Sequence, residues 1–230
     1  PDKNNSYLRI LENKPTALVQ RLNGASVERP DGAHCEAMGQ ALAQLHIAGQ
    51  SFDGFRENER GPHWWKEMKN KLESHLGEDD LELLNNEIDY QARFRFAELP
   101  RGVIHADLFR DNALFVGHSL TGIIDFYYAC NDALLYDVAV TVNDWCSNDE
   151  GELDESRLAG FLNAYDRQRP FNANEKEAWP VMLRAAALRF WLSRLHDFHF
   201  PRDGEITHTK DPDVFKRILC NRIQYKDVLN

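Results

Sequence analysis

A short block of strand-forming sequence interrupts a chain whose remaining pattern is mostly helical. The block begins after Leu99-Pro100-Arg101-Gly102, and polar residues separate its apolar runs, which are residues 103–104, 113–116 and 121–126. On both sides apolar residues recur at spacings of three and four, which predicts helices over residues 31–46, 63–76, 79–97, 132–146, 154–169, 173–199 and 211–228. The sequence therefore predicts an α+β fold, in which a mostly helical body holds a small β insert.

The N-terminal segment carries a second, smaller strand signal. Residues 7–11 and 17–22 are short apolar runs, and Glu12-Asn13-Lys14-Pro15 lies between them. This arrangement predicts a hairpin of two strands. Asn23-Gly24 then ends the second strand, because asparagine and glycine favour turns.

Composition limits the classes of function. The chain has 230 residues, of which 43% are hydrophobic, and its formal net charge is −10. The negative charge argues against broad binding to nucleic acid or to a membrane surface, and no apolar run approaches the roughly 20 residues of a membrane span. The four cysteines are scattered without a C-x-x-C pair, so we expect reduced thiols in a soluble, cytoplasmic protein. The chain begins with proline, so we expect a fragment.

The polar residues of the β insert form the most informative motif. His105-Ala106-Asp107 follows one apolar run, Asn112 directly precedes the next, and Asp125 lies near the end of the last. This is the spacing of a phosphoryl-transfer loop, in which the first aspartate accepts the proton of the acceptor hydroxyl while the asparagine and the second aspartate bind Mg²⁺. We expect His105 to support this loop through hydrogen bonds. Capping of strands and turns by the same residue types is the weaker alternative.

The segment from Gly102 to Cys146 resembles the homoserine kinases of the aminoglycoside-phosphotransferase-like superfamily, whose fold is related to that of protein kinases. The resemblance rests on the peptides GVIHADLFRDNALF and GIIDFYYACNDALLYDVAVTVNDWC, and extends more thinly from about Ala17 to the C-terminus. The peptides FYYACND and NDWC favour homoserine kinase within the superfamily. Ala106 and Phe109 depart from the common pattern, which has glycine and histidine at these positions.

The resemblance implies a protein-kinase-like fold with two parts. Residues 1–24 would be the end of an N-terminal nucleotide lobe with the hinge, and residues 25–230 the helical C-terminal lobe that holds the catalytic and substrate sites. Backbone groups of Gln20 and Leu22 would meet the adenine of ATP, unless this segment is an ordinary edge strand. Asp107 would be the catalytic base beside His105, and Asn112 and Asp125 would bind Mg²⁺.

Candidate acceptor-binding residues lie in two predicted helices. Asn143 and Asp144 end the first helix and would face the acceptor, with Asp144 on a substrate ammonium group or, as the alternative, paired with a structural arginine. The apolar stripe over residues 173–199 indicates a core helix. Arg189 or Arg194 within it would bind a substrate carboxylate.

The resemblance implies ATP-dependent phosphorylation of the hydroxyl of L-homoserine, a step toward threonine, with ATP and Mg²⁺ as cofactors. A kinase for an aminoglycoside, choline or a sugar is an alternative, as is a non-catalytic relative that binds a ligand; a metallophosphoesterase is less favoured. The only lysines before Ala17 are Lys3 and Lys14, and both lie in polar, turn-like sequence, so we expect this chain to lack a complete nucleotide lobe. We expect truncation rather than loss of that lobe. The oligomeric state is left open by the sequence.

Overall fold

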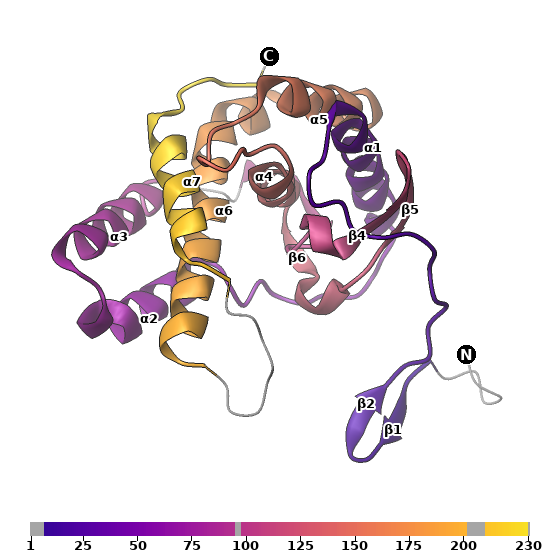
Figure 1. Ribbon diagram of the computed structural model, residues 1–230, viewed down its shortest axis with the longest axis horizontal. Helices are drawn as coiled ribbons and strands as arrows, with labels where there is room; N and C mark the ends of the chain where they lie inside the picture. Colours follow the sequence, from indigo (N-terminus) through magenta and orange to yellow (C-terminus); the bar gives the residue numbers. More distant parts are fainter. Residues whose placement is uncertain (1–6, 95–97, 202–209, 230) are drawn as a thin grey trace.

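The long helix α6 (Ala173–His199) runs through the helical body of the protein in the computed structural model, which describes residues 7–94, 98–201 and 210–229 (Figure 1). Residues 181–192 are all buried. Helices α2 (Pro62–Leu72), α4 (Leu134–Trp145) and α7 (Asp213–Gln224) pack against α6. Because this part of α6 is covered on all sides, its arginines must find partners inside the protein. The predicted core helix is confirmed.

A second helical pair, α1 (Gly32–Gly49) and α5 (Glu155–Gln168), packs beside the β insert. Asp31 is the N-cap of helix α1, and its carboxylate accepts a hydrogen bond from the backbone N–H of His34 at 3.1 Å. Gly39 allows the two helices to approach closely, because a Cβ atom at this position would lie 2.2 Å from the carbonyl oxygen of Phe161.

Substitution Gly39→Ala is therefore expected to lower the free energy of unfolding by about 1–3 kcal/mol, the usual cost of overpacking a core. The clash is with backbone, so α5 must move as a unit to relieve it. Chemical denaturation measures the effect. Gly32→Ala is the matched control in the same helix, since its Cβ atom would meet only the hydroxyl oxygen of Ser156, at 3.7 Å. Equal stability of the two variants would contradict this account of the helix contact.

The β insert consists of two antiparallel pairs. Strand β3 (Arg101–Ile104) pairs with β6 (Cys130–Ala133), and β4 (Ala113–Val116) pairs with β5 (Ser119–Ile123). Strand β6 is absent from the sequence prediction, which placed residue 132 already in a helix. The polar residues Asn131 and Asp132 hide the strand pattern, while pairing with β3 and an ion pair of 3.0 Å between Arg101 and Asp132 fix it.

The N-terminal hairpin differs from the prediction. Strands β1 (Arg9–Leu11) and β2 (Lys14–Thr16) are joined by Glu12 and Asn13, both with positive φ (50° and 61°), as in a two-residue type I′ turn. The predicted second strand over residues 17–22 was wrong, because the tight turn places the pairing directly after Asn13. The hairpin stands apart from the helical body (Figure 1).

Several predicted helix ends also differ, among them that of α1, which runs to Gly49 and not to residue 46. Helix α2 ends at Leu72 and continues as the short 3-10 helix Glu73–His75, α3 (Glu78–Gln91) ends before residue 97, and α7 ends at Gln224. Residues 95–97 of the predicted helix lie outside the described residues. Within the described part of the chain, no helix has both the length and the apolar character that a membrane crossing requires.

Candidate active site

The loop that follows β3 is held by the buried carboxylate of Asp137 in α4. Its two oxygens accept hydrogen bonds from the backbone N–H groups of His105 (2.7 Å) and Ala106 (2.8 Å). Ala106 has a φ of 63°, a left-handed conformation that costs a non-glycine residue roughly 1–2 kcal/mol. Glycine adopts this conformation without a steric cost, which explains why the common pattern has glycine at position 106. The hydrogen bonds to Asp137 hold the strained backbone in place.

His105 supports the loop from within. Its Nε2 donates to the carbonyl oxygen of Ile124 at 2.9 Å, and its Nδ1 accepts from the backbone N–H of Asp107 at 3.3 Å. The ring is fully buried and contacts Phe126. Both ring nitrogens are thus engaged with backbone groups, which leaves His105 to position Asp107 and not to accept a substrate proton.

Asn112 and Asp125 are brought together by the β insert. The side-chain N–H₂ of Asn112 donates to the carbonyl oxygen of Asp107 at 2.8 Å, and its backbone carbonyl accepts from the N–H of Ile124 at 2.9 Å. Asp125 follows directly, with a φ of 63° that turns the chain out of β5. No hydrogen bond or ion pair from the described residues engages the Asp125 carboxylate, which leaves its oxygens available to a cation.

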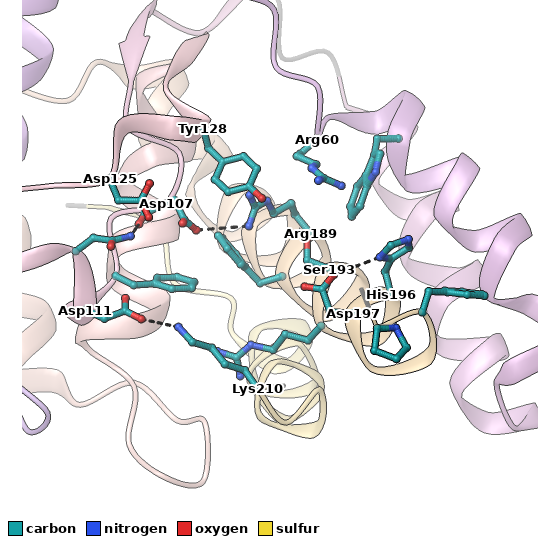
Figure 2. Close-up of a pocket in the computed structure, with 17 residues that line it drawn as sticks. Arg60, Asp107, Asp111, Asp125, Tyr128, Arg189, Ser193, His196, Asp197 and Lys210 are labelled. Atoms are coloured by element: carbon teal, nitrogen blue, oxygen red, sulfur yellow. Dashed lines mark hydrogen bonds and ion pairs between the residues drawn. The ribbon is translucent and has the colours of Figure 1, made fainter. Parts of the chain in front are cut away.

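These three side chains line a cavity of about 410 Å³ (Figure 2). Asp107, Asn112 and Asp125 form one side of it, and Figure 2 shows the carboxylates of Asp107 and Asp125 close together. Four cationic side chains also line it, namely Arg60, Arg189, Arg194 and Lys210, together with aromatic residues and the carboxylates of Asp111 and Asp197. The cavity thus combines oxygen ligands for a metal with cationic groups for an anionic substrate.

Asp107 has the properties of a general base. Burial raises its pKa to about 6, although the guanidinium group of Arg189 acts in the opposite direction. The nearest pair of atoms in this interaction, Arg189 Nη1 and Asp107 Oδ1, is 3.7 Å apart, and the Asp107 side chain is 17% exposed. A pKa near the working pH lets the carboxylate accept a proton and release it again.

The other predicted substrate residues have different surroundings. Arg189 and Arg194 line the cavity, and Arg194 also donates to the carbonyl oxygen of Asp211 at 3.0 Å. Asn143 differs from the prediction: it lies fully buried, donates to Leu183 O at 2.8 Å and accepts from Arg222 Nε at 2.9 Å. It therefore acts as a link inside the core and does not face the acceptor.

Asp144 is paired with an arginine. Its carboxylate accepts from the backbone N–H of Arg110 at 2.8 Å and from Arg110 Nε at 3.1 Å. It lines a neighbouring surface hollow and not the cavity around Asp107. The structure thus agrees with the alternative of a structural pair. The loop residue Asp111 pairs with Lys210 at 2.6 Å.

The predicted adenine contacts lie in the extended segment before α1. Gln20 is exposed and Leu22 is half-buried, and neither belongs to a strand. Leu22 packs closely over Gly122 of β5, so this segment follows the edge of the β insert. Contact of their backbone groups with adenine stays a prediction.

The sequence prediction did not include three residues that build the site. Asp137 stands alone in the apolar run of α4, and an isolated aspartate in such a run signals a buried group that needs partners. Arg60 lies in a loop and Tyr136 in the core. No local pattern distinguishes either of them.

Comparison with known proteins agrees with this geometry. Residues 4–171 match the phosphotransferase enzyme family. A homoserine kinase of Methylobacillus flagellatus is 49% identical over 229 residues, which cover 99% of this chain and 72% of the relative. A homoserine kinase of Janthinobacterium sp. is 47% identical over 95% of this chain and 70% of the relative.

Solved structures show the fold. An amicoumacin kinase superposes with a TM-score of 0.65 at 14% identity, over 96% of this chain and 69% of that one. An aminoglycoside phosphotransferase of Alicyclobacillus acidocaldarius gives a TM-score of 0.65 at 16% identity, over 96% of this chain and 75% of that one. The predicted protein-kinase-like fold, with a mostly helical C-terminal lobe, is confirmed. The chain belongs to the phosphotransferase enzyme family and is a relative of homoserine kinases.

Proposed function

We propose that this protein transfers the terminal phosphoryl group of ATP to the hydroxyl group of L-homoserine. The observation that carries the proposal is the convergence of Asp107, Asn112 and Asp125 on one cavity that also holds buried Arg189. The homoserine kinases that are 42–49% identical to this chain over the aligned residues support the choice of acceptor.

The proposed roles follow from the contacts of each side chain. The acceptor oxygen forms a bond to the terminal phosphorus while the bond to the bridging oxygen of ADP breaks, and Asp107 takes the hydroxyl proton. Arg189 or Arg194 binds the acceptor carboxylate. Backbone groups of Gln20 and Leu22 hold adenine, in the proposed division into residues 1–24 and 25–230.

Asn112 and Asp125 fit a site for Mg²⁺. The amide nitrogen of Asn112 is tied to the Asp107 carbonyl, so its Oδ1 is the free ligand atom, and Asp125 adds carboxylate oxygens without a competing partner among the described residues. Such hard oxygen ligands suit Mg²⁺. When bound, the ion would offset the negative charge of the phosphate oxygens.

A cytoplasmic location is part of the proposal. All four cysteines are free thiols, and Cys35, Cys130 and Cys146 are buried. Free thiols of this kind are typical of reducing compartments.

Release of ADP in a coupled assay tests the proposed function. The complete gene product that contains residues 1–230, supplied with ATP, Mg²⁺ and L-homoserine, is expected to release ADP and to form a phosphate monoester detectable by ³¹P NMR. The Asp107→Ala variant sets the background. Turnover no higher than this background would overturn the proposal.

A further inference from the structure

Two arginine side chains lie against the same aromatic ring at the edge of the cavity. The guanidinium carbon of Arg60 is 5.7 Å from the centroid of the Tyr128 ring, and that of Arg189 is 5.0 Å from it. Arg60 also lies over Trp64, at 4.5 Å. Figure 2 shows Arg60, Tyr128 and Arg189 side by side, with Arg189 continuing to Asp107. The rings hold both cations in place.

The same three residues also line a smaller cavity next to the first. Its volume is about 10 Å³, room for about one oxygen-sized group, and the hydroxyl-bearing ring of Tyr136 forms part of its wall. Arg60, Tyr128 and Arg189 are therefore the boundary between the main cavity and this recess, which we call the side recess.

Two hydrogen-bond donors of residues that line the side recess have no acceptor, although the acidic residues Glu57 and Glu59 line it too, the latter paired with Arg56. Arg189 Nε and the Tyr136 hydroxyl are buried and have no hydrogen-bond partner among the described residues, and the two residues are only 3% and 5% exposed. The Arg189–Asp107 contact of 3.7 Å is too long for a hydrogen bond. The guanidinium group of Arg60 has no carboxylate partner in the described chain. Since buried donors are almost always paired, these groups are available to an acceptor that enters the recess, such as an oxygen of an anionic substrate.

We propose that Arg60, Arg189 and Tyr136 bind the carboxylate of the acceptor. A carboxylate has two oxygens, and guanidinium groups match its planar geometry. One oxygen enters the side recess and accepts from Arg189 Nε and the Tyr136 hydroxyl, while the other accepts from Arg60. This inference rests on the proposed function and deepens it, because it assigns the carboxylate to the Arg60 side of the cavity and not to Arg194.

The distance to the base selects the length of the acceptor. Arg189 Nη1 lies 3.7 Å from Asp107 Oδ1, so the guanidinium group that carries the unpaired Nε is close to the base, and an acceptor bound to both residues must have its hydroxyl and carboxyl groups only a few bonds apart. In L-homoserine four bonds separate the hydroxyl oxygen from the carboxyl carbon, a span of about 5 Å when extended. The subsite therefore favours short hydroxy acids over longer or uncharged alcohols.

A pair of acceptors and a pair of variants test this subsite. L-Homoserine and 3-aminopropan-1-ol differ only by the carboxyl group. In the complete gene product, Arg60→Gln and Tyr136→Phe are each expected to lower kcat/KM for L-homoserine by roughly 10- to 100-fold, the effect of losing one charge-assisted hydrogen bond. The kcat/KM for 3-aminopropan-1-ol is expected to stay within about twofold. The control is Arg167→Gln, which is expected to change neither value. Arg167 is an exposed residue of α5 that pairs with Glu36 of α1, away from the cavity.

Several outcomes would overturn the subsite. Parallel losses for both acceptors would mean that Arg60 and Tyr136 act through structure alone. A carboxylate-specific loss in Arg194→Gln, with none in Arg60→Gln and Tyr136→Phe, would move the carboxylate to Arg194. If the unsubstituted protein turned over both acceptors equally, it would be an alcohol kinase that does not recognise the carboxyl group, and the subsite would be excluded.

A protein that phosphorylates neither acceptor would overturn the proposed function instead. The subsite is then judged by calorimetry with 4-hydroxybutyrate, which keeps the hydroxyl and carboxyl groups of L-homoserine without its amine. Binding that weakens at least tenfold in both Arg60→Gln and Tyr136→Phe supports the subsite, and unchanged or absent binding overturns it.

Discussion

Substitution of Asp107 by asparagine is expected to lower kcat for L-homoserine phosphorylation by about 10²- to 10⁴-fold, the usual contribution of a general base. Asparagine keeps the size of the side chain but cannot take up the hydroxyl proton. KM should change little, because the residues proposed to bind the carboxylate and the metal remain. Steady-state ADP release measures both constants, and circular dichroism confirms that the variant is folded. A variant with near-normal kcat would exclude Asp107 as the base.

The pH profile provides a second view of the same group. The pKa of Asp107 is raised to about 6, and the base must be deprotonated to act. The kcat/KM of the unsubstituted protein should therefore fall tenfold per pH unit below about pH 6 and level off above it. The residual activity of Asp107→Asn should lack this acidic limb. If both proteins show the same limb, another group is titrating.

The catalytic loop could be predicted because its information is local. His105, Asp107 and Asn112 stand within one strand–loop–strand passage, and Asp125 follows a short hairpin, so the spacing in sequence fixes the spacing in space. The helices could be predicted for a similar reason, since apolar periodicity reports directly on which face is buried. Of the two hydrogen bonds of the His105 ring, the one from the backbone N–H of Asp107 is local, whereas the one to the carbonyl oxygen of Ile124 crosses the β insert.

What could not be predicted depends on partners distant in the chain. Strand β6 exists because β3 pairs with it, although its own residues Asn131 and Asp132 are polar. Residues 17–22 are mostly apolar but form no strand, because the tight turn at Asn13 pairs β1 with β2 alone. Arg60 reaches the cavity from a loop, and only its position beside Tyr128 and Arg189 gives it a role.

Asp137 is the clearest case of such a long-range group, because it joins three parts of the protein. Its carboxylate accepts from the two backbone N–H groups at the start of the catalytic loop and lies 3.1 Å from Nε2 of His46 in α1. His46 Nδ1 in turn lies 2.7 Å from the hydroxyl oxygen of Tyr165 in α5. The Asp137 and His46 side chains are fully buried. Although burial alone would raise it, the pKa of Asp137 is lowered by the hydrogen bond and charge of His46, with help from His105.

Substitution Asp137→Asn is therefore expected to lower the free energy of unfolding at pH 7 by about 3–5 kcal/mol, the cost of breaking a buried charged network. The amide supplies a single acceptor oxygen for three donors and turns N–H groups toward the others, so the loop at Ala106 loses its support and kcat should fall as well.

Because the folded pKa is lowered, the stabilisation by Asp137 is present above its ordinary pKa of 3.8 and is lost as the pH falls through the folded value. Urea unfolding at several pH values should show the two proteins differing most near neutrality and converging in acid. Asp79→Asn, at an exposed site in the first turn of α3, should shift stability by no more than about 0.5 kcal/mol. A comparably small effect of Asp137→Asn at pH 7 would mean that the loop holds its left-handed residue without this carboxylate.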